Sequence, residues 1–388
     1  MKKTLINLAH KRNFQLAFTF LFVLAITLQK YLLESDWANY TGYNNYMIFK
    51  QSFFHLIEGN DLYQKYPAEH YDLFKYSPTF ALLMGSLAFL PNFLGLFLWN
   101  LLNVFVLFLG LKQFKFAHKS GFIFACLFVL IELITTTQNS QSNALIAGLI
   151  LLAYNALQSN KHSKAAFYLV STVFIKLFGL VAFALFLFFP KKLKSAGYSV
   201  LWIIILGVIP LITVTYGVLE MNYLSWLDLL KNDHSNELKF SVMGFLNSWF
   251  GVEPELKNKV MLVGIVLFTF PLIKISSYSI LRFKELYLAS ILLWVVLFNH
   301  MAESATFIIA VTGVAVWFFT KKNPSVIDKV LLVLVILFTL LSPSDIYPAS
   351  LRNSVFIPYT IKVIPCILVW LKINIELFFV NEKVKINS

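Results

Sequence analysis

Residues 34–91 read ESDWANYTGYNNYMIFKQSFFHLIEGNDLYQKYPAEHYDLFKYSPTFALLMGSLAFLP and form the longest polar interval of the chain. The interval follows the first apolar segment directly and is dense in tyrosine, asparagine, acidic residues and histidine. Two membrane helices do not need so much polar, aromatic surface merely to connect them. We therefore expect this loop to be the chemically active face of a membrane protein, with the apolar segments forming a bundle beneath it.

The composition places the chain among polytopic membrane proteins. Of its 388 residues, 59% are hydrophobic and 13% are charged, whereas a soluble domain has about 25% charged residues. Long apolar runs recur from end to end. The net charge of +13 does not indicate a nucleic-acid partner, because the basic residues lie in short clusters between apolar segments, as orientation signals do. Cys126 and Cys366 both lie inside apolar runs, so no disulfide framework is expected.

The first apolar segment predicts an uncleaved span over residues 14–33. A basic stretch precedes it, as in a signal peptide, but residues 30–37 offer no small-residue cleavage site. The basic N-terminus places the first loop, residues 34–92, on the extracytoplasmic side. Within that loop, the apolar run 79–90 is too short to cross comfortably, so we expect a juxtamembrane helix there.

The remaining apolar runs predict about ten to twelve spans, with both termini cytoplasmic. The further expected spans are residues 93–111, 121–137, 144–157, 198–219, 260–275, 286–298, 304–319, 330–341 and 355–371. In this topology about 21 of the 32 lysines and arginines fall inside, with about 4 of the 19 acids, as the positive-inside rule requires. We expect one domain over residues 1–388, comprising the first loop (34–92), core spans (93–219), a second outer loop (220–258) and C-terminal spans (259–388).

The run from Ala165 to Phe189 predicts a broken helix. It begins and ends at basic clusters that belong inside, and one span cannot start and finish on the same side. Two half-length passes that meet near Lys176 satisfy this rule, and broken helices at membrane depth line cavities. A lysine in an apolar run indicates a functional site, here the neutralisation of a phosphate. The alternative is a side chain that extends to the interface.

Two further charges lie inside apolar runs. For Lys362 we favour a side chain that extends to the membrane surface. Glu132 either pairs with a buried lysine or faces a wet cavity, and the sequence leaves both alternatives open. The uncharged cluster of residues 135–143, TTTQNSQSN, either binds hydroxyls and phosphate oxygens or forms a polar hairpin with capping residues.

Acids, histidines and aromatic residues gather in the outer loops. The acids of the first loop are Glu34, Asp36, Glu58, Asp61, Glu69 and Asp72, and its histidines are His55 and His70. His300 and Glu303 lie at another outer helix junction. A carboxylate near an acceptor hydroxyl is what sugar transfer needs in a general base. The loop tyrosines suit carbohydrate stacking and equally suit an interfacial belt.

No nucleotide loop, glycine-rich fingerprint or metal-ligand triplet is visible in the sequence. A soluble nucleotide-sugar site is therefore not expected. A membrane-embedded donor, such as a sugar on a polyprenyl phosphate, is the simplest substitute.

Four short motifs resemble, in order, those of glycosyltransferase family 87, multi-pass enzymes of the GT-C type that use polyprenyl-phosphate-linked sugars. They are Gly59-Asn60-Asp61-Leu62-Tyr63, Tyr76-Ser77-Pro78, Ser140-Gln141-Ser142-Asn143 and Lys176-Leu177. The resemblance covers roughly residues 37–192, and the C-terminal half resembles the family in hydropathy only. It implies an all-α, GT-C-like helical bundle in the cytoplasmic membrane.

The chain also departs from the family pattern. Asn45 occupies the position at which the resemblance implies an aspartate base, and an amide cannot take a proton in that role. Ser77, Ser140 and Leu177 stand where the family has proline, glycine and proline. Either another acid serves as base, with Asp36 as the first choice and Glu303 as the second, or the amide only orients the acceptor, or this branch has lost or changed its activity.

The resemblance implies a hexosyl transferase, of the mannosyl type, that moves a sugar from the lipid phosphate to an acceptor hydroxyl on the extracytoplasmic side. The roles we expect are catalysis for Asp36, Asn45 and Glu303, donor-phosphate binding for Lys176, Gln141 and Asn143, and substrate binding for Asp61, Tyr63, Tyr76 and His300. Membrane lipid, the lipid-linked donor and a glycan or lipid acceptor are the expected partners. No resident cofactor and no metal is indicated.

The alternative reading is a transporter or a flippase for lipid-linked sugars, because embedded charges and broken helices fit that class too. The large polar first loop and the absence of a visible internal repeat favour the enzyme.

Overall fold

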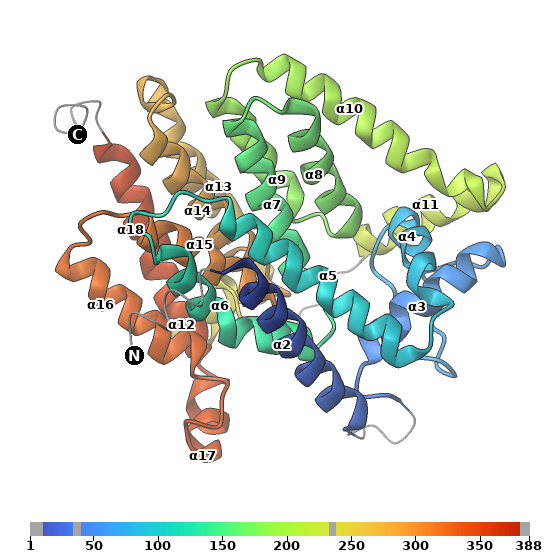
Figure 1. Cartoon of the computed structure of the whole chain (residues 1–388). Helices are drawn as coiled ribbons and strands as arrows, with labels where there is room; N and C mark the ends of the chain where they lie inside the picture. Colours follow the sequence, from blue (N-terminus) through green and yellow to red (C-terminus); the bar gives the residue numbers. More distant parts are fainter. Residues whose placement is uncertain (1–10, 34–39, 233–237, 381–388) are drawn as a thin grey trace. The chain divides into compact units, whose positions relative to one another are not determined.

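The computed structural model describes residues 11–33, 40–232 and 238–380, and every regular element within them is a helix (Figure 1). The expected all-α architecture is thus confirmed. The chain forms two compact units. Unit 1 comprises Met1–Gln113, Leu133–Leu180 and Leu193–His234, and unit 2 comprises Phe114–Glu132, Val181–Lys192 and Ser235–Ser388.

Unit 1 is organised around α7. Its helices are α2 (Arg12–Leu32), α3 (Asn44–Ile57), α4 (Pro78–Ala88), α5 (Asn92–Lys112), α7 (Asn143–Gln158), α8 (His162–Ile175), α10 (Lys192–Val208) and α11 (Tyr216–Asn232). Helix α7 is apolar and buried on nearly all sides and packs against α5 and α8. Gly148 allows this close packing, because a Cβ there would lie 2.6 Å from the backbone nitrogen of Leu107.

Unit 2 is organised around α14 and α15, which pack against each other and against α18. Its helices are α12 (Val242–Phe250), α13 (Lys257–Thr269), α14 (Leu281–Leu297), α15 (Phe307–Phe319), α16 (Val326–Leu334), α17 (Ala349–Leu351) and α18 (Ile364–Phe379), with the short α9 (Gly179–Ala182) and η1 (Phe183–Phe188) at its boundary. Helix α6 (Gly121–Gln138) belongs to unit 2 up to Glu132 and to unit 1 from Leu133.

The lengths and hydropathy of the helices identify a multi-pass membrane protein. Among the described residues, five helical segments are long and apolar enough to cross a membrane: Arg12–Leu32, Asn92–Lys112, Gly121–Gln138, Lys192–Ile212 and Pro254–Ile273. A bent pair, Ala349–Phe356 with Ile361–Phe379, makes a sixth if it counts as one span. Shorter apolar helices such as Asn143–Gln158 and Ser304–Phe319 account for other runs that the sequence predicts as spans.

One predicted span, residues 198–219, is wrong as a continuous helix. Helix α10 ends at Val208, a 3-10 turn covers Ile209–Ile212, and α11 begins only at Tyr216. Pro210 lies in the turn, and proline removes a backbone donor and clashes with the preceding helical turn. The predicted second outer loop, residues 220–258, therefore begins inside a helix.

The last predicted span, residues 355–371, is also not one helix. The segments Ala349–Phe356 and Ile361–Phe379 meet at an angle of 79°. Pro358 lies in the break, and Thr360 has a φ of 47°, in the left-handed region. Both corrections have the same cause. Each apolar run contains a proline at which the helix breaks, and hydropathy alone does not reveal such a break.

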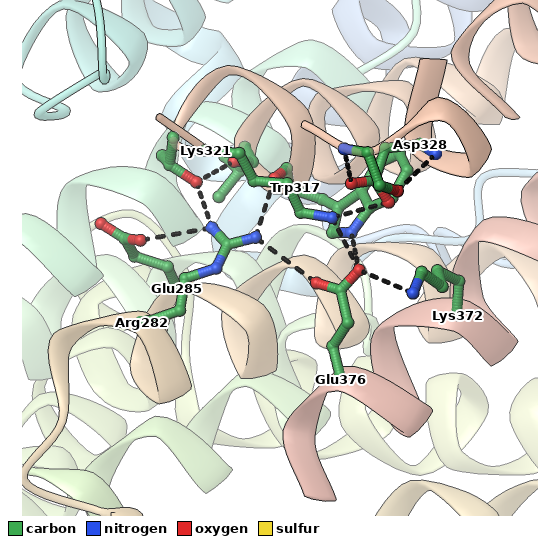
Figure 2. A network of polar contacts seen from close by, with 10 residues as sticks. Arg282, Glu285, Trp317, Lys321, Asp328, Lys372 and Glu376 are labelled. Carbon is green, nitrogen blue, oxygen red and sulfur yellow. Dashed lines mark hydrogen bonds and ion pairs between the residues drawn. The ribbon is translucent and has the colours of Figure 1, made fainter. Parts of the chain in front are cut away.

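A polar network joins the ends of four helices in unit 2 (Figure 2). The guanidinium of Arg282 donates to the carbonyl of Trp317 at 3.1 Å and lies 3.6 Å from the carboxylate of Glu376. The ammonium of Lys321 lies 2.6 Å from Glu376 and 2.8 Å from Asp328. Basic residues far apart in the sequence, Arg282, Lys321 and Lys372, thus meet around Glu376 in unit 2.

Candidate functional site in unit 1

The helix break predicted near Lys176 is confirmed. Helix α8 ends at Ile175, and Lys176 has extended backbone angles, φ −145° and ψ 142°. The chain then turns back so closely that a Cβ on Gly179 would overlap the hydroxyl of Thr172. Lys176 has the backbone conformation that a following proline would impose, although leucine follows it here.

The Lys176 ammonium lies in a polar and aromatic environment. It donates a hydrogen bond to Oδ1 of Asn143 at 3.1 Å. It also lies 5.5 Å from the ring centroids of Tyr76 and Phe178, within the range of a cation–π contact. Within the described part of the chain, no carboxylate forms an ion pair with Lys176. The half-buried positive charge is therefore held by neutral groups.

The loop that presents Asn143 to Lys176 is fixed by its own hydrogen bonds. Ser140 has a φ of 52°, the left-handed conformation that explains why a glycine is expected at this position. The indole nitrogen of Trp99 donates to the Ser140 carbonyl at 2.8 Å. Asn143 is fully buried and donates to the side-chain oxygen of Gln141, so its own oxygen is directed at the lysine. The predicted trio of Lys176, Gln141 and Asn143 is thus brought together.

Tyr76 and Ser77 connect the first loop to the end of α8. The Ser77 hydroxyl donates to the Phe174 carbonyl at 2.6 Å and accepts from the backbone nitrogen of Phe80, which caps α4. Tyr63 donates from its hydroxyl to the Tyr76 carbonyl at 2.7 Å. A proline at position 77 would have no hydroxyl for these bonds, so the serine has a clear structural role.

Asn45 contacts the same polar loop. It lies in the first turn of α3, and its amide nitrogen donates to the backbone carbonyl of Asn139 at 2.8 Å. This is a donor role, which an aspartate carboxylate cannot fill. Asp36, the first choice for the base, lies outside the described residues.

Asp61 and Tyr63 line a groove of about 590 Å³ between the first loop and α11. Lys75, Ser225 and Asp228 also contribute to its wall. The Asp61 carboxylate accepts from the backbone nitrogen of Tyr63 at 3.0 Å and from the Ser225 hydroxyl at 3.1 Å. Asp61 therefore shapes the turn in addition to lining the groove.

The two remaining predicted residues, His300 and Glu303, belong to unit 2. The Glu303 carboxylate lies 2.9 Å from the ammonium of Lys239, a partner that could not be predicted from the sequence. The His300 carbonyl accepts from the backbone nitrogen of Lys239 at 3.0 Å. His300 also lines a small cavity of about 150 Å³ with Ser241 and Asn258.

Unit 2 also contains a buried ion pair that corrects one expectation. Lys362 does not extend to the membrane surface: it is 2% exposed, and its ammonium lies 2.7 Å from the carboxylate of Glu132. Of the two alternatives for Glu132, the structure thus shows pairing with a buried lysine. The signal was present in the sequence as two opposite charges, each inside an apolar run.

These features define a class before any comparison: a multi-pass, all-α membrane protein with an ammonium held at a helix break beside a polar loop. Residues 74–343 match the model of Glycosyltransferase family 87, which is more than half of the chain. The chain therefore belongs to glycosyltransferase family 87. The matched segment includes Tyr76, Asn143 and Lys176 and begins after Asp61 and Tyr63.

Among solved structures, the chain is similar to ArnT from Cupriavidus metallidurans, in a crystal structure bound to undecaprenyl phosphate. The two share 13% sequence identity with a TM-score of 0.44, and the match covers 93% of this chain and 75% of ArnT. No curated protein matches the chain in sequence.

Proposed function

We propose that the protein transfers a sugar, a hexose of the mannosyl type, from a polyprenyl-phosphate donor to an acceptor hydroxyl on the extracytoplasmic side of the cytoplasmic membrane. The observation that carries this proposal is the Lys176 ammonium, which is held by Asn143 at a helix break within a chain of glycosyltransferase family 87. The basic clusters between the apolar segments support a topology in which both termini are cytoplasmic.

The ammonium suits a donor whose leaving group is a lipid phosphate. In the proposed reaction, the acceptor oxygen bonds to the anomeric carbon, the bond from that carbon to the phosphate oxygen breaks, and the phosphate leaves with the bonding electrons. Negative charge grows on the phosphate in the transition state, and a prepositioned cation stabilises it there. Lys176 supplies this charge, while Gln141 and Asn143 orient it.

The acceptor proton requires a base. Asn45 does not serve, because its amide has no basic oxygen and its nitrogen is bound to the Asn139 carbonyl. We assign the base to a carboxylate, with Asp36 as the first candidate and Glu303 as the second. The groove lined by Asp61 and Tyr63 offers carboxylates and hydroxyls that suit the hydroxyls of an acceptor glycan.

The test uses purified protein in proteoliposomes with a panel of polyprenyl-phosphate sugars, each radiolabelled in the sugar, and lipid extract from cells that lack the protein. We expect labelled product from at least one donor. Lys176→Ala is expected to lower the rate by about 100-fold or more, the usual effect of removing one transition-state donor. Lys164→Ala is the matched control, because Lys164 is exposed near the start of the same helix.

Failure of every donor, or equal rates for Lys176→Ala and the wild type, would overturn the proposal. Uptake or flipping of the labelled lipid without a new glycosidic product would favour the transporter class instead.

A further inference from the structure

Three metal-ligating side chains meet in the first loop of unit 1, apart from Lys176. His55 lies in the last turn of α3, and Glu69 and His70 lie in the loop that follows. One ligand atom from each residue lies within 4.8 Å of the others. His55 Nε2 is 2.9 Å from Glu69 Oε2. The sequence analysis names all three residues in the first loop, but their spacing matches no familiar metal motif.

The loop is built so that these residues face one another. Gly59 has a φ of 79°, which allows the chain to reverse directly after α3. The ring of Tyr66 stacks on that of His55 with 3.7 Å between centroids. The backbone nitrogens of Glu69 and His70 both donate to the Tyr66 carbonyl, at 2.9 and 3.1 Å. Backbone hydrogen bonds and ring stacking therefore help to hold the three side chains in place.

The simplest alternative is an ordinary ion pair of His55 with Glu69 beside a buried histidine. That reading leaves His70 unexplained. His70 is only 3% exposed, and among the residues that the structure describes its Nδ1 is buried without a hydrogen-bond partner in range. A buried polar atom without a partner costs about 1–3 kcal/mol, and such an atom calls for a missing ligand. A cation held jointly by the three side chains would account for a buried imidazole at this position.

We propose that His55, Glu69 and His70 form a zinc site. Two imidazoles and one carboxylate are a ligand set that suits Zn²⁺, whereas Ca²⁺ and Mg²⁺ take oxygen ligands. Ligand atoms about 2 Å from a tetrahedral zinc lie about 3.4 Å apart. On binding, the His55–Glu69 pair at 2.9 Å therefore opens by about 0.5 Å, and no other pair closes by more than about 1.5 Å. The Glu69 side chain, 35% exposed, leaves the fourth position open to water.

Zinc at this position would fasten the loop to α3. The Tyr66 hydroxyl donates to the Asp61 carbonyl at 2.7 Å, so the fastened segment includes the turn that lines the groove. The role assigned to the metal is to order this loop. Zinc binding is measured without any sugar transfer, so a failure of the zinc proposal can be distinguished from a failure of the proposed transferase activity.

The test is metal analysis of the full-length protein, purified in detergent through an affinity tag without histidine. After chelation and dialysis, the protein is titrated with Zn²⁺ by calorimetry, and its bound metal is measured by mass spectrometry. We expect one zinc per chain and a higher unfolding midpoint with zinc. His70→Ala and Glu69→Gln are expected to lose stoichiometric binding. His118→Ala is the matched control, since His118 lies outside the cluster.

Two arms keep the result decisive if His70→Ala fails to fold. Glu69→Gln alters a partly exposed side chain, and Co²⁺ bound to the wild type reports histidine ligands through its visible absorption. Zinc retained equally by both variants, or no zinc bound by the wild type at equimolar metal, would overturn the proposal.

Discussion

Glu132 and Lys362 form an ion pair inside unit 2, with 2.7 Å between the carboxylate Oε1 and the ammonium Nζ. Neither residue is more than 2% exposed. The hydroxyl of Ser304 lies 2.7 Å from the same ammonium and accepts a second hydrogen bond. Each charge makes the other tolerable among apolar side chains, because a lone buried ion loses its hydration without compensation.

Replacing Lys362 by methionine leaves the Glu132 carboxylate buried without its cation. We expect the free energy of unfolding to fall by about 3–5 kcal/mol, which thermal unfolding in detergent will show as a lower midpoint. The double variant Glu132→Gln, Lys362→Met removes both charges at similar volume and is expected to recover most of the loss. A double variant as unstable as the single one would contradict a stabilising role for the pairing.

Asn143→Asp places a carboxylate 3.1 Å from the Lys176 ammonium, where the amide oxygen now lies. The new ion pair neutralises the charge that the proposed reaction directs at the lipid phosphate. We expect kcat/KM for the donor to fall by about 100-fold. The variant also loses the hydrogen bond that the amide donates to Gln141, which is expected to lower the unfolding free energy by about 1 kcal/mol. Asn155→Asp adds the same charge farther along α7 and serves as the control. Transfer by Asn143→Asp at nearly the wild-type rate would refute the role of Lys176.

Asn45→Asp restores the residue that the family resemblance implies, but it removes the donor that binds the Asn139 carbonyl. We expect a loss of about 1 kcal/mol in unfolding free energy, the usual net value of one hydrogen bond, and no gain in transfer rate. Asn45→Ala removes the same donor without adding a charge, so it separates the two effects. A clear rise in transfer for Asn45→Asp alone would show instead that this position accepts a catalytic base.

The Lys321–Asp328 ion pair gives unit 2 a pH-dependent contribution to stability. Burial alone would raise the pKa of Asp328, but the hydrogen bonds from Lys321 and the Ser325 backbone outweigh it and hold the pKa below its usual value of 3.8. A depressed carboxyl pKa stabilises the folded state above the unfolded pKa, and this stabilisation is lost as pH falls through the folded-state pKa.

Asp328→Asn is accordingly expected to lower the unfolding free energy by about 1.5–3 kcal/mol at pH 7, the range for hydrogen bonds to a charged group. The difference from the wild type should shrink as the pH falls below about 4. Unfolding midpoints of both proteins across pH 3–7 measure this. A difference that stays constant over the whole range would rule out the ion pair as its source.

Local features of this chain could be predicted from its sequence, because they depend on neighbours within a few residues. Apolar runs and flanking prolines located α4 and α5 nearly to the residue. The break at Lys176 followed from one lysine between two basic clusters. Prolines inside apolar runs were the source of error, as Pro210 and Pro358 show, because hydropathy does not register a missing backbone donor.

Partner choice across long separations could not be predicted. Glu132 and Lys362 are 230 residues apart in the chain, and only the packing of unit 2 brings them together. The sequence left pairing open for Glu132 without naming the lysine, and for Lys362 it favoured a side chain that extends to the membrane surface. The ion pair of Lys239 with Glu303 could not be predicted for the same reason. Nor could the proximity of His55 and His70, which depends on the reversal of the chain at Gly59.

The Ser77 hydroxyl, at the start of α4, donates a hydrogen bond to the carbonyl of Phe174. Phe174 lies two residues before Lys176 in the chain. This hydrogen bond links the start of α4, which belongs to the first loop, to the segment that carries Lys176. In the proposed reaction, binding of an acceptor by the first loop would therefore be coupled to the position of Lys176 through this hydrogen bond.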